Sequence, residues 1–142
     1  MTTRFIAEVS SNHSQDISRC YEFIDIAAEI GCDAVKFQLF RIDQLFSSEI
    51  LLKSAMHRKR KQWELPFSFI PLLVERAKQN NIDFCCTPFD LESANYLLDF
   101  VDFFKVSSYE MIWDDLIAVC AQSSKPLILS TGMATLQEVE IA

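Results

Sequence analysis

Five short apolar runs alternate with segments of helical periodicity, and this alternation constrains the fold more than any other feature of the chain. The runs occupy residues 4–9, 34–40, 82–87, 101–106 and 126–130. Each is nearly continuously apolar, which is typical of strands buried on both faces of a parallel sheet. A strand–helix order repeated five times therefore predicts an α/β protein in which helices cover a parallel sheet.

The segments between the runs carry signals for helix ends. Residues 17–28 place apolar side chains three and four positions apart, as on one helical face. Asp16 precedes that face as a predicted N-cap, and Gly31 stands where a left-handed residue ends a helix. The later predicted caps are Ser68 (with Phe67 and Leu72 as a hydrophobic staple), Asp90, Asp114 and a Thr135–Glu138 capping box.

The number of units and the length of the chain favour one fold of this class. A (βα)8 TIM barrel needs roughly 250 residues, and this chain has 142. A doubly wound sheet could also hold five units, but the last predicted helix has only roughly two turns. We therefore expect residues 1–142 to form about the first five βα units of a TIM-type barrel, as one part of a single domain.

Composition excludes several functions. A net charge of −7 argues against binding to nucleic acid or to anionic membranes. The chain has two glycines, so it has no glycine-rich phosphate loop. The chain shows no signal peptide and no apolar window of about 20 residues that would suit a membrane span. Five cysteines without a CxxC spacing predict free, mostly buried thiols in a cytoplasmic protein: Cys20, Cys32, Cys85, Cys86 and Cys120.

Polar side chains stand at the ends of the predicted strands. In parallel α/β folds ligands bind at the carboxyl ends of strands, so these groups should converge. A single strand lysine more often serves a structural ion pair, but two lysines with nearby hydroxyls favour a site for a carboxylate or a phosphate. The converging residues are Glu8, Asn12, Lys36, Gln38, Thr87, Asp90, Lys105, Ser107, Ser108, Glu110 and Ser130.

Five motifs resemble, in the same order, those of the sialic acid synthase (NeuB) family. They are Ala7-Glu8 with Asn12-His13, and residues 33–38, 86–90, 104–110 and 125–133. The resemblance implies condensation of phosphoenolpyruvate with an N-acetylated amino sugar, which gives a nonulosonic acid and phosphate. It also implies a catalytic TIM barrel, usually followed by a small antifreeze-like domain. The chain resembles only the first half of that barrel, so we expect it to be inactive alone.

The resemblance also implies roles for individual residues. Glu8 and Glu110 match acidic family positions that face the sugar and the reacting carbon. Glu110 lies just past the anion ligands, so we expect it to handle water or a proton at the enolpyruvyl carbon. Glu8 lies on the first predicted strand, apart from the anion ligands, and we expect it to bind sugar hydroxyls or the metal-bound water. Asn12, Gln38 and Asp90 rank second, and Asp90 is equally explained as a helix cap. The implied phosphoenolpyruvate ligands are Lys36, Thr87, Lys105, Ser108 and Ser130.

Cofactor and partners follow from the same resemblance. The family binds a divalent manganese or magnesium ion through two histidines of later strands, so we expect no metal ligand here, and neither His13 nor His57 matches one. The expected partners are phosphoenolpyruvate, an amino sugar and further copies of the chain. Two departures stand out: the loop after the second strand lacks a family asparagine, and Ser107-Ser108-Tyr109 replaces the commoner Gly-Ser-Gly.

Three questions stay open at this point. The basic run of residues 57–61 is most simply a solvated loop or helix, and alternatively a flap that steers the anionic substrate. A lysine Schiff-base aldolase, using Lys36 or Lys105 as nucleophile, is an alternative enzyme. A non-catalytic half-barrel that pairs with another copy through its open sheet edges is the third possibility.

Overall fold

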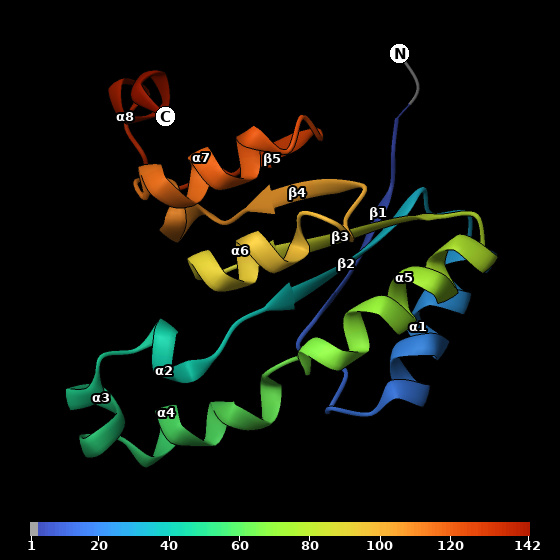
Figure 1. The fold of residues 1–142 in the computed structure, drawn as a ribbon, viewed down its shortest axis with the longest axis horizontal. Coiled ribbons are helices and arrows are strands. Elements are labelled where there is room, and N and C mark those ends of the chain that lie inside the picture. Colours follow the sequence, from blue (N-terminus) through green and yellow to red (C-terminus); the bar gives the residue numbers. More distant parts are fainter. Residues whose placement is uncertain (1–2) are drawn as a thin grey trace.

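A five-stranded parallel sheet forms the centre of the protein. The computed structural model describes residues 3–142. The strands are β1 (Ile6–Ser10), β2 (Ala34–Leu39), β3 (Asp83–Pro88), β4 (Phe103–Val106) and β5 (Leu127–Leu129), in the spatial order β1-β2-β3-β4-β5 (Figure 1). A doubly wound sheet would reverse its strand order at a switch point. The unbroken sequential order is that of a TIM-barrel wall, so the predicted fold class is confirmed.

A helix follows each strand, and the four longer helices pack on one face of the sheet. They are α1 (Ile17–Glu29), α5 (Ile70–Gln79), α6 (Leu91–Leu97) and α7 (Asp114–Gln122), and α8 (Leu136–Ile141) follows β5 (Figure 1). The main core joins their buried side chains to alternate strand residues such as Phe37, Phe84 and Phe104. The rings of Phe37 and Phe84 stack with centroids 5.9 Å apart. The remaining strand positions face away from these helices.

Three predicted helix starts are confirmed and two are wrong. Asp16 accepts from Ser18 N at 2.8 Å, Asp90 caps α6, and the capping box opens α8. Ser68 is no cap, because a 3₁₀ turn (Phe67–Phe69) precedes α5 and Pro71 lies in the first turn of that helix. Phe67 lies in this turn and packs against Tyr96, with ring centroids 4.9 Å apart. Asp114 is already inside α7, whose N-cap is Trp113.

The long segment between β2 and α5 contains short helices. They are α2 (Ile42–Leu45), α3 (Ser48–Lys53) and α4 (Ala55–Lys59), followed by the 3₁₀ turn η1 (Arg60–Trp63). Figure 1 shows this segment beyond the end of the sheet toward which the β2 arrow points. None of these elements exceeds six residues, which is too short for helical periodicity to identify. The basic run therefore forms helical turns near the carboxyl ends of the strands.

Candidate functional site

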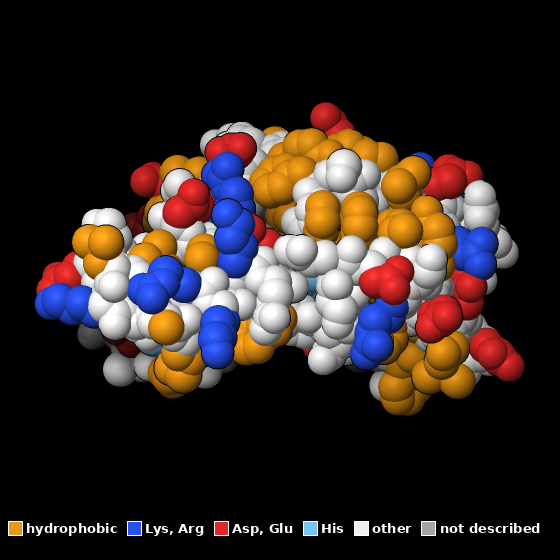
Figure 2. Space-filling model, turned by 90° about the horizontal axis from the view of Figure 1, so that it is seen from below, with side chains coloured by type: hydrophobic (Ala, Val, Ile, Leu, Met, Phe, Trp, Pro, Cys, Tyr) orange, Lys and Arg blue, Asp and Glu red, His pale blue; other side chains and the backbone are white. Residues whose placement is uncertain are grey.

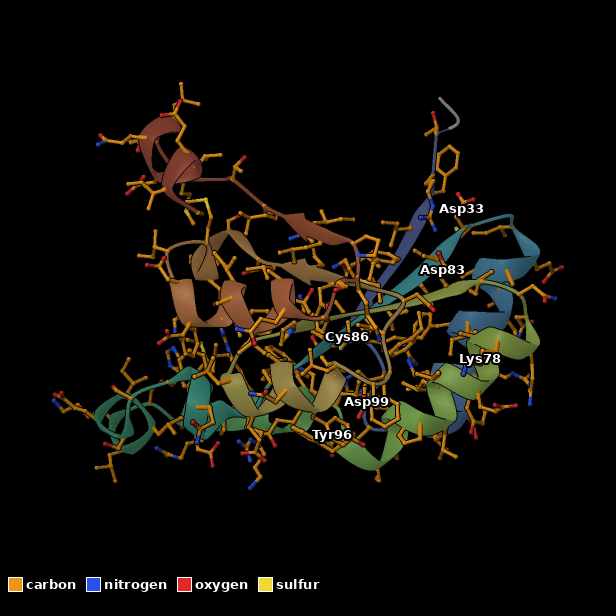
Figure 3. All side chains as sticks on the ribbon, turned by 45° about the horizontal axis from the view of Figure 1, so that its top comes forward. Asp33, Lys78, Asp83, Cys86, Tyr96 and Asp99 are labelled. Atoms are coloured by element: carbon orange, nitrogen blue, oxygen red, sulfur yellow. The ribbon has the colours of Figure 1, made fainter. Side chains whose placement is uncertain are left out.

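The sheet face opposite the helices, here called the inner face, carries most of the predicted site. Parallel pairing aligns Glu8 with Lys36 and Cys85, and Gln38 with Thr87, so these side chains share one face. Lys105 lies on the same face, two residues after Phe103, which is aligned with Cys85. The neighbouring Cys86 has the opposite orientation and belongs to the helix-side core; it is labelled near the middle of the sheet in Figure 3.

Glu8 and Lys36 form an ion pair across β1 and β2. The side chain of Lys36 is 13% exposed and that of Glu8 is 43% exposed. The expectation that Glu8 lies apart from the anion ligands is therefore wrong. Its cause is the strand register, which places the two residues side by side and which no pattern in the sequence reveals. Glu8 consequently offsets the charge of one of the two site lysines.

Lys105 is half-buried and has no carboxylate partner among the described ion pairs. Its Nζ donates a hydrogen bond to the carbonyl oxygen of Val106 at 2.6 Å. Burial lowers the pKa of Lys105, and the positive charge of Lys36 lowers it further, while Glu8 and Glu110 act in the opposite direction. Two lysines that repel each other on one sheet face favour an anion placed between them.

Thr87 supplies a buried hydroxyl to the inner face. The residue is 1% exposed, and no described group forms a hydrogen bond with its Oγ1. Leaving such a group unpaired costs about 1–3 kcal/mol, so an unpaired hydroxyl in a native fold points to a missing partner. The aligned Gln38 accepts a hydrogen bond from Ser10 Oγ at 3.0 Å. The positive φ of Ser10 accompanies a shift of register between Glu8 and Ser10 in the pairing of β1 with β2.

The segment after β4 places Glu110 and Ser108 beside the loop that follows β5. Ser107 Oγ donates a hydrogen bond to Glu110, a contact that sequence reasoning missed. Ser108 Oγ would lie 2.9 Å from a Cβ built on Gly132, so this position has no room for a side chain unless Ser108 moves. Ser130 continues the β4–β5 pairing through a hydrogen bond from its N to Val106 O at 3.1 Å. These loops therefore bring Ser108 and Gly132 together.

Two second-rank residues have local structural roles. Asn12 closes the turn after β1, because its Nδ2 donates to Val9 O at 3.0 Å. The two carboxylate oxygens of Asp90 accept from Ser93 N at 2.7 Å and from Ser93 Oγ at 2.8 Å. Asp90 is only 4% exposed. These contacts support its role as a helix cap.

A pocket of about 540 Å³ opens at the carboxyl ends of the strands. Gln38 and Glu110 line it, so it adjoins the predicted site. Its remaining walls come from residues that sequence reasoning did not assign to a site: Ser11, Phe40, Leu45, Phe46, Arg60, Trp63, Phe89 and Tyr109. The basic run was the one signal that pointed to this region.

Neither histidine lies in a cluster suited to a metal ion. Within residues 3–142 no three His, Cys, Asp or Glu side chains come close enough to form one. His13 is buried, its Nδ1 accepts from Gln15 N at 3.0 Å, and burial lowers the pKa of His13. His57 Nδ1 lies 2.7 Å from Ser54 Oγ. The helices of the described part are all too short or too polar to cross a membrane.

Comparison with known proteins gives consistent matches. The NeuB family model matches residues 23–142. N,N'-diacetyllegionaminic acid synthases of Campylobacter jejuni and Legionella pneumophila are 36% and 35% identical, covering 99% and 100% of this chain. A Drosophila melanogaster N-acetylneuraminate-9-phosphate synthase is 30% identical. The chain spans only 45%, 43% and 39% of these relatives, less than half of each.

Solved structures agree in fold. An N-acetylneuraminic acid synthetase from Leptospira borgpetersenii, in complex with citrate, superposes with a TM-score of 0.89 at 30% identity. The match covers 99% of this chain and 48% of that one. A truncated 3-deoxy-D-arabino-heptulosonate 7-phosphate synthase from Thermotoga maritima reaches a TM-score of 0.69 at 12% identity, which supports the fold alone.

Proposed function

This chain belongs to the NeuB family, and on that basis we propose that the full-length protein condenses phosphoenolpyruvate with an N-acetylated amino sugar. The matched relatives include synthases of legionaminic, pseudaminic and sialic acids. In this proposal the inner face binds phosphoenolpyruvate, and the neighbouring pocket receives the sugar. The products are a nonulosonic acid and inorganic phosphate.

The arrangement of Lys36, Lys105 and Thr87 carries this proposal. Two lysine charges share one sheet face, and burial disfavours the charge of Lys105 in the absence of a counter-ion. A substrate with a carboxylate and a phosphate supplies negative charge for both lysines and an acceptor for the Thr87 hydroxyl. Ser108 and Ser130, at the ends of β4 and β5, complete the proposed set of ligands.

The proposed chemistry divides between binding and proton transfer. A carbon–carbon bond forms between the enolpyruvyl group and the sugar carbonyl, water adds to the enolpyruvyl carbon, and phosphate leaves. Glu110 is the proposed group that moves a proton in the water step, and Ser107 orients its carboxylate. Glu8 neutralises Lys36 and is the proposed contact to the sugar.

The proposal has three further parts. The full-length protein binds a divalent manganese or magnesium ion, is located in the cytoplasm and forms a homo-oligomer. The described residues form no cluster of three potential metal ligands. Chelation followed by readdition of manganese or magnesium tests the metal. Free cysteines support a reducing compartment. Light scattering of the full-length protein in solution measures its molar mass and so the number of subunits.

Phosphate release tests the function directly. The full-length protein is incubated with phosphoenolpyruvate and either N-acetylmannosamine or a 2,4-diacetamido-2,4,6-trideoxyhexose, and phosphate is measured against a control without sugar. We expect sugar-dependent release, and a polypeptide of residues 1–142 alone should give none. Absence of release from the full-length protein with every amino sugar tested would contradict the proposal.

A Schiff-base aldolase remains the competing chemistry, because a lysine with a lowered pKa, as at Lys105, suits a nucleophile. Borohydride reduction in the presence of pyruvate would fix such an adduct covalently. We expect mass spectrometry to show none. A trapped lysine would favour the aldolase.

A further inference from the structure

The wall of the pocket at the strand ends contains an arginine that no predicted role includes. Arg60 lies in η1 and lines the pocket together with Trp63 and Phe46, while Gln38 and Glu110 line it from the strand side. Arg60 is the one Lys or Arg among the described residues that line this pocket. Lys36 and Lys105 are not part of its lining.

The guanidinium of Arg60 lies near two aromatic rings. Its Cζ is 5.4 Å from the ring centroid of Phe46 and 5.7 Å from that of Trp63. In the described part of the chain, no ion pair and no hydrogen bond engages this guanidinium. Packing against rings stabilises the cation without using its N–H groups, so the planar set of donors stays available to a ligand.

The segment that carries Arg60 is fixed to the sheet end of the protein. Gln15 Nε2 donates to Lys61 O and to Glu64 O, each at 3.0 Å. Glu64 in turn accepts from Ile42 N at 2.8 Å. The chain directly after Arg60 is therefore tied both to the loop after β1 and to the start of α2, which is poorly suited to a swinging flap. Figure 2 shows several Lys and Arg side chains at the α3–α4 end of the molecule.

We propose that Arg60 binds the acyl oxygen of the N-acetylated sugar, with Trp63 and Phe46 packing against the acyl methyl group. This inference rests on the proposed function. An acetamido group combines a carbonyl acceptor with a methyl group, and the pocket wall combines free N–H donors with aromatic surface. In the proposed function the anion site is formed by Lys36 and Lys105, outside this pocket. Arg60 therefore binds the sugar and not the phosphate.

Electrostatic steering by the whole basic run is the competing explanation. A steering effect would depend on total charge and would weaken with salt, since exposed charges are screened beyond about 8–10 Å at physiological ionic strength. Lys59 offers a matched control, because it carries the same charge in the same run, is exposed, and does not line the pocket.

Steady-state kinetics of the full-length protein test the inference, with phosphoenolpyruvate and the N-acetylated sugar each varied. Arg60→Ala should raise the KM for the sugar about tenfold or more and change the KM for phosphoenolpyruvate less than twofold. Arg60→Lys should recover only part of the loss, because an ammonium lacks the planar donors. Lys59→Ala should leave both constants unchanged, and unchanged thermal melting of all variants shows that folding is intact.

Three outcomes would overturn the inference. They are an unchanged sugar KM in Arg60→Ala, an equal rise in the KM for phosphoenolpyruvate, or an equal effect of Lys59→Ala that disappears at high salt. In each case the wild-type protein still releases phosphate, so the proposed function stands. A wild-type protein that releases no phosphate with any amino sugar overturns both.

Discussion

At the scale of single residues, the two site lysines differ in their surroundings. Lys36 is neutralised by Glu8, whereas Lys105 has a backbone carbonyl as its described partner. An anion therefore gains more from Lys105, which forms no ion pair among the described residues. Substitution of Lys105 therefore tests the anion site more directly than substitution of Lys36.

Lys105→Ala in the full-length protein should weaken phosphoenolpyruvate binding about ten- to hundredfold, since a charge-assisted contact is worth about 1.5–3 kcal/mol. Calorimetric titration measures this. Lys125→Ala is the matched control, because Lys125 Nζ donates to Leu98 O and Val101 O, each at 2.6 Å. The control should lose stability and keep its affinity. Unfolding of Lys105→Ala with unchanged affinity would make Lys105 a structural residue.

The lowered pKa of Lys105 predicts the pH dependence of binding. The protonated amine binds the anion, so affinity is full below the lowered pKa and is lost as the pH rises through it, before the ordinary value of 10.5. The unfolded chain binds this proton more tightly, so the stability contribution of Lys105 increases as the pH rises. Titrations with phosphoenolpyruvate at a series of alkaline pH values measure the affinity. The affinity of the wild-type protein should fall below pH 10.5, whereas that of Lys105→Arg should not, because the arginine stays charged.

Substitutions of Glu110 and Glu8 should affect different kinetic constants. Glu110→Gln should lower kcat about 10²–10⁴-fold with little change in either KM, because proton transfer supports the transition state. Ser107→Ala should lower kcat less, by disordering the same carboxylate. Glu8→Gln should raise the KM for the amino sugar, but not that for phosphoenolpyruvate, since it leaves Lys36 more positive. An effect of Glu110→Gln on KM alone would contradict its role.

At the scale of elements, Asp90 serves the helix that follows β3. Asp90→Ala removes two hydrogen bonds and leaves the buried Ser93 without its cap. We expect the free energy of unfolding to fall by about 1–3 kcal/mol, measured by urea denaturation. Ser93→Ala, which removes one of the two bonds, should cost less. A change in substrate KM at full stability would instead make Asp90 a ligand.

The first residues of the helices show where the neighbouring sequence alone determines where a helix begins. Asp16 and Thr135 cap as predicted because an extended residue with a side-chain acceptor directly precedes the first turn. Ser68 fails because Pro71 suits the first turn of a helix that starts one residue later than predicted, with Phe69 as its N-cap. The helices of residues 42–59 escape prediction because each is too short to show periodicity.

At the scale of the whole molecule, strand order and the choice of face could be predicted, but contacts between elements could not. The apolar runs predicted the parallel sheet, which is confirmed, and the strand-end lysines predict an anion site at the carboxyl ends of the strands, which stays a prediction. The Glu8–Lys36 pair depends on register, and the approach of Arg60 to Gln38 and Glu110 depends on how a long connection folds back. Both are set by tertiary packing, which local sequence does not encode.

Four buried cysteines report whether the chain unfolds as one unit. Cys20, Cys86 and Cys120 belong to one core cluster that spans α1, β3 and α7, and Cys85 lies on the inner face. All four are 0% exposed. Burial raises the pKa of Cys20 and Cys120 to about 11 and that of Cys85 to about 12. In the native chain, iodoacetamide at pH 8 should therefore modify Cys32, which is half-buried, long before the others.

If the shared core makes residues 3–142 cooperative, the four buried thiols should be modified at one common rate, which increases with urea as global unfolding does. Mass spectrometry of the labelled peptides measures each site separately. The β4–β5 end gives the critical comparison, because β5 contains no fully buried residue. Earlier modification of Cys120 than of Cys20 would show that this end opens independently and that the core is not one unit.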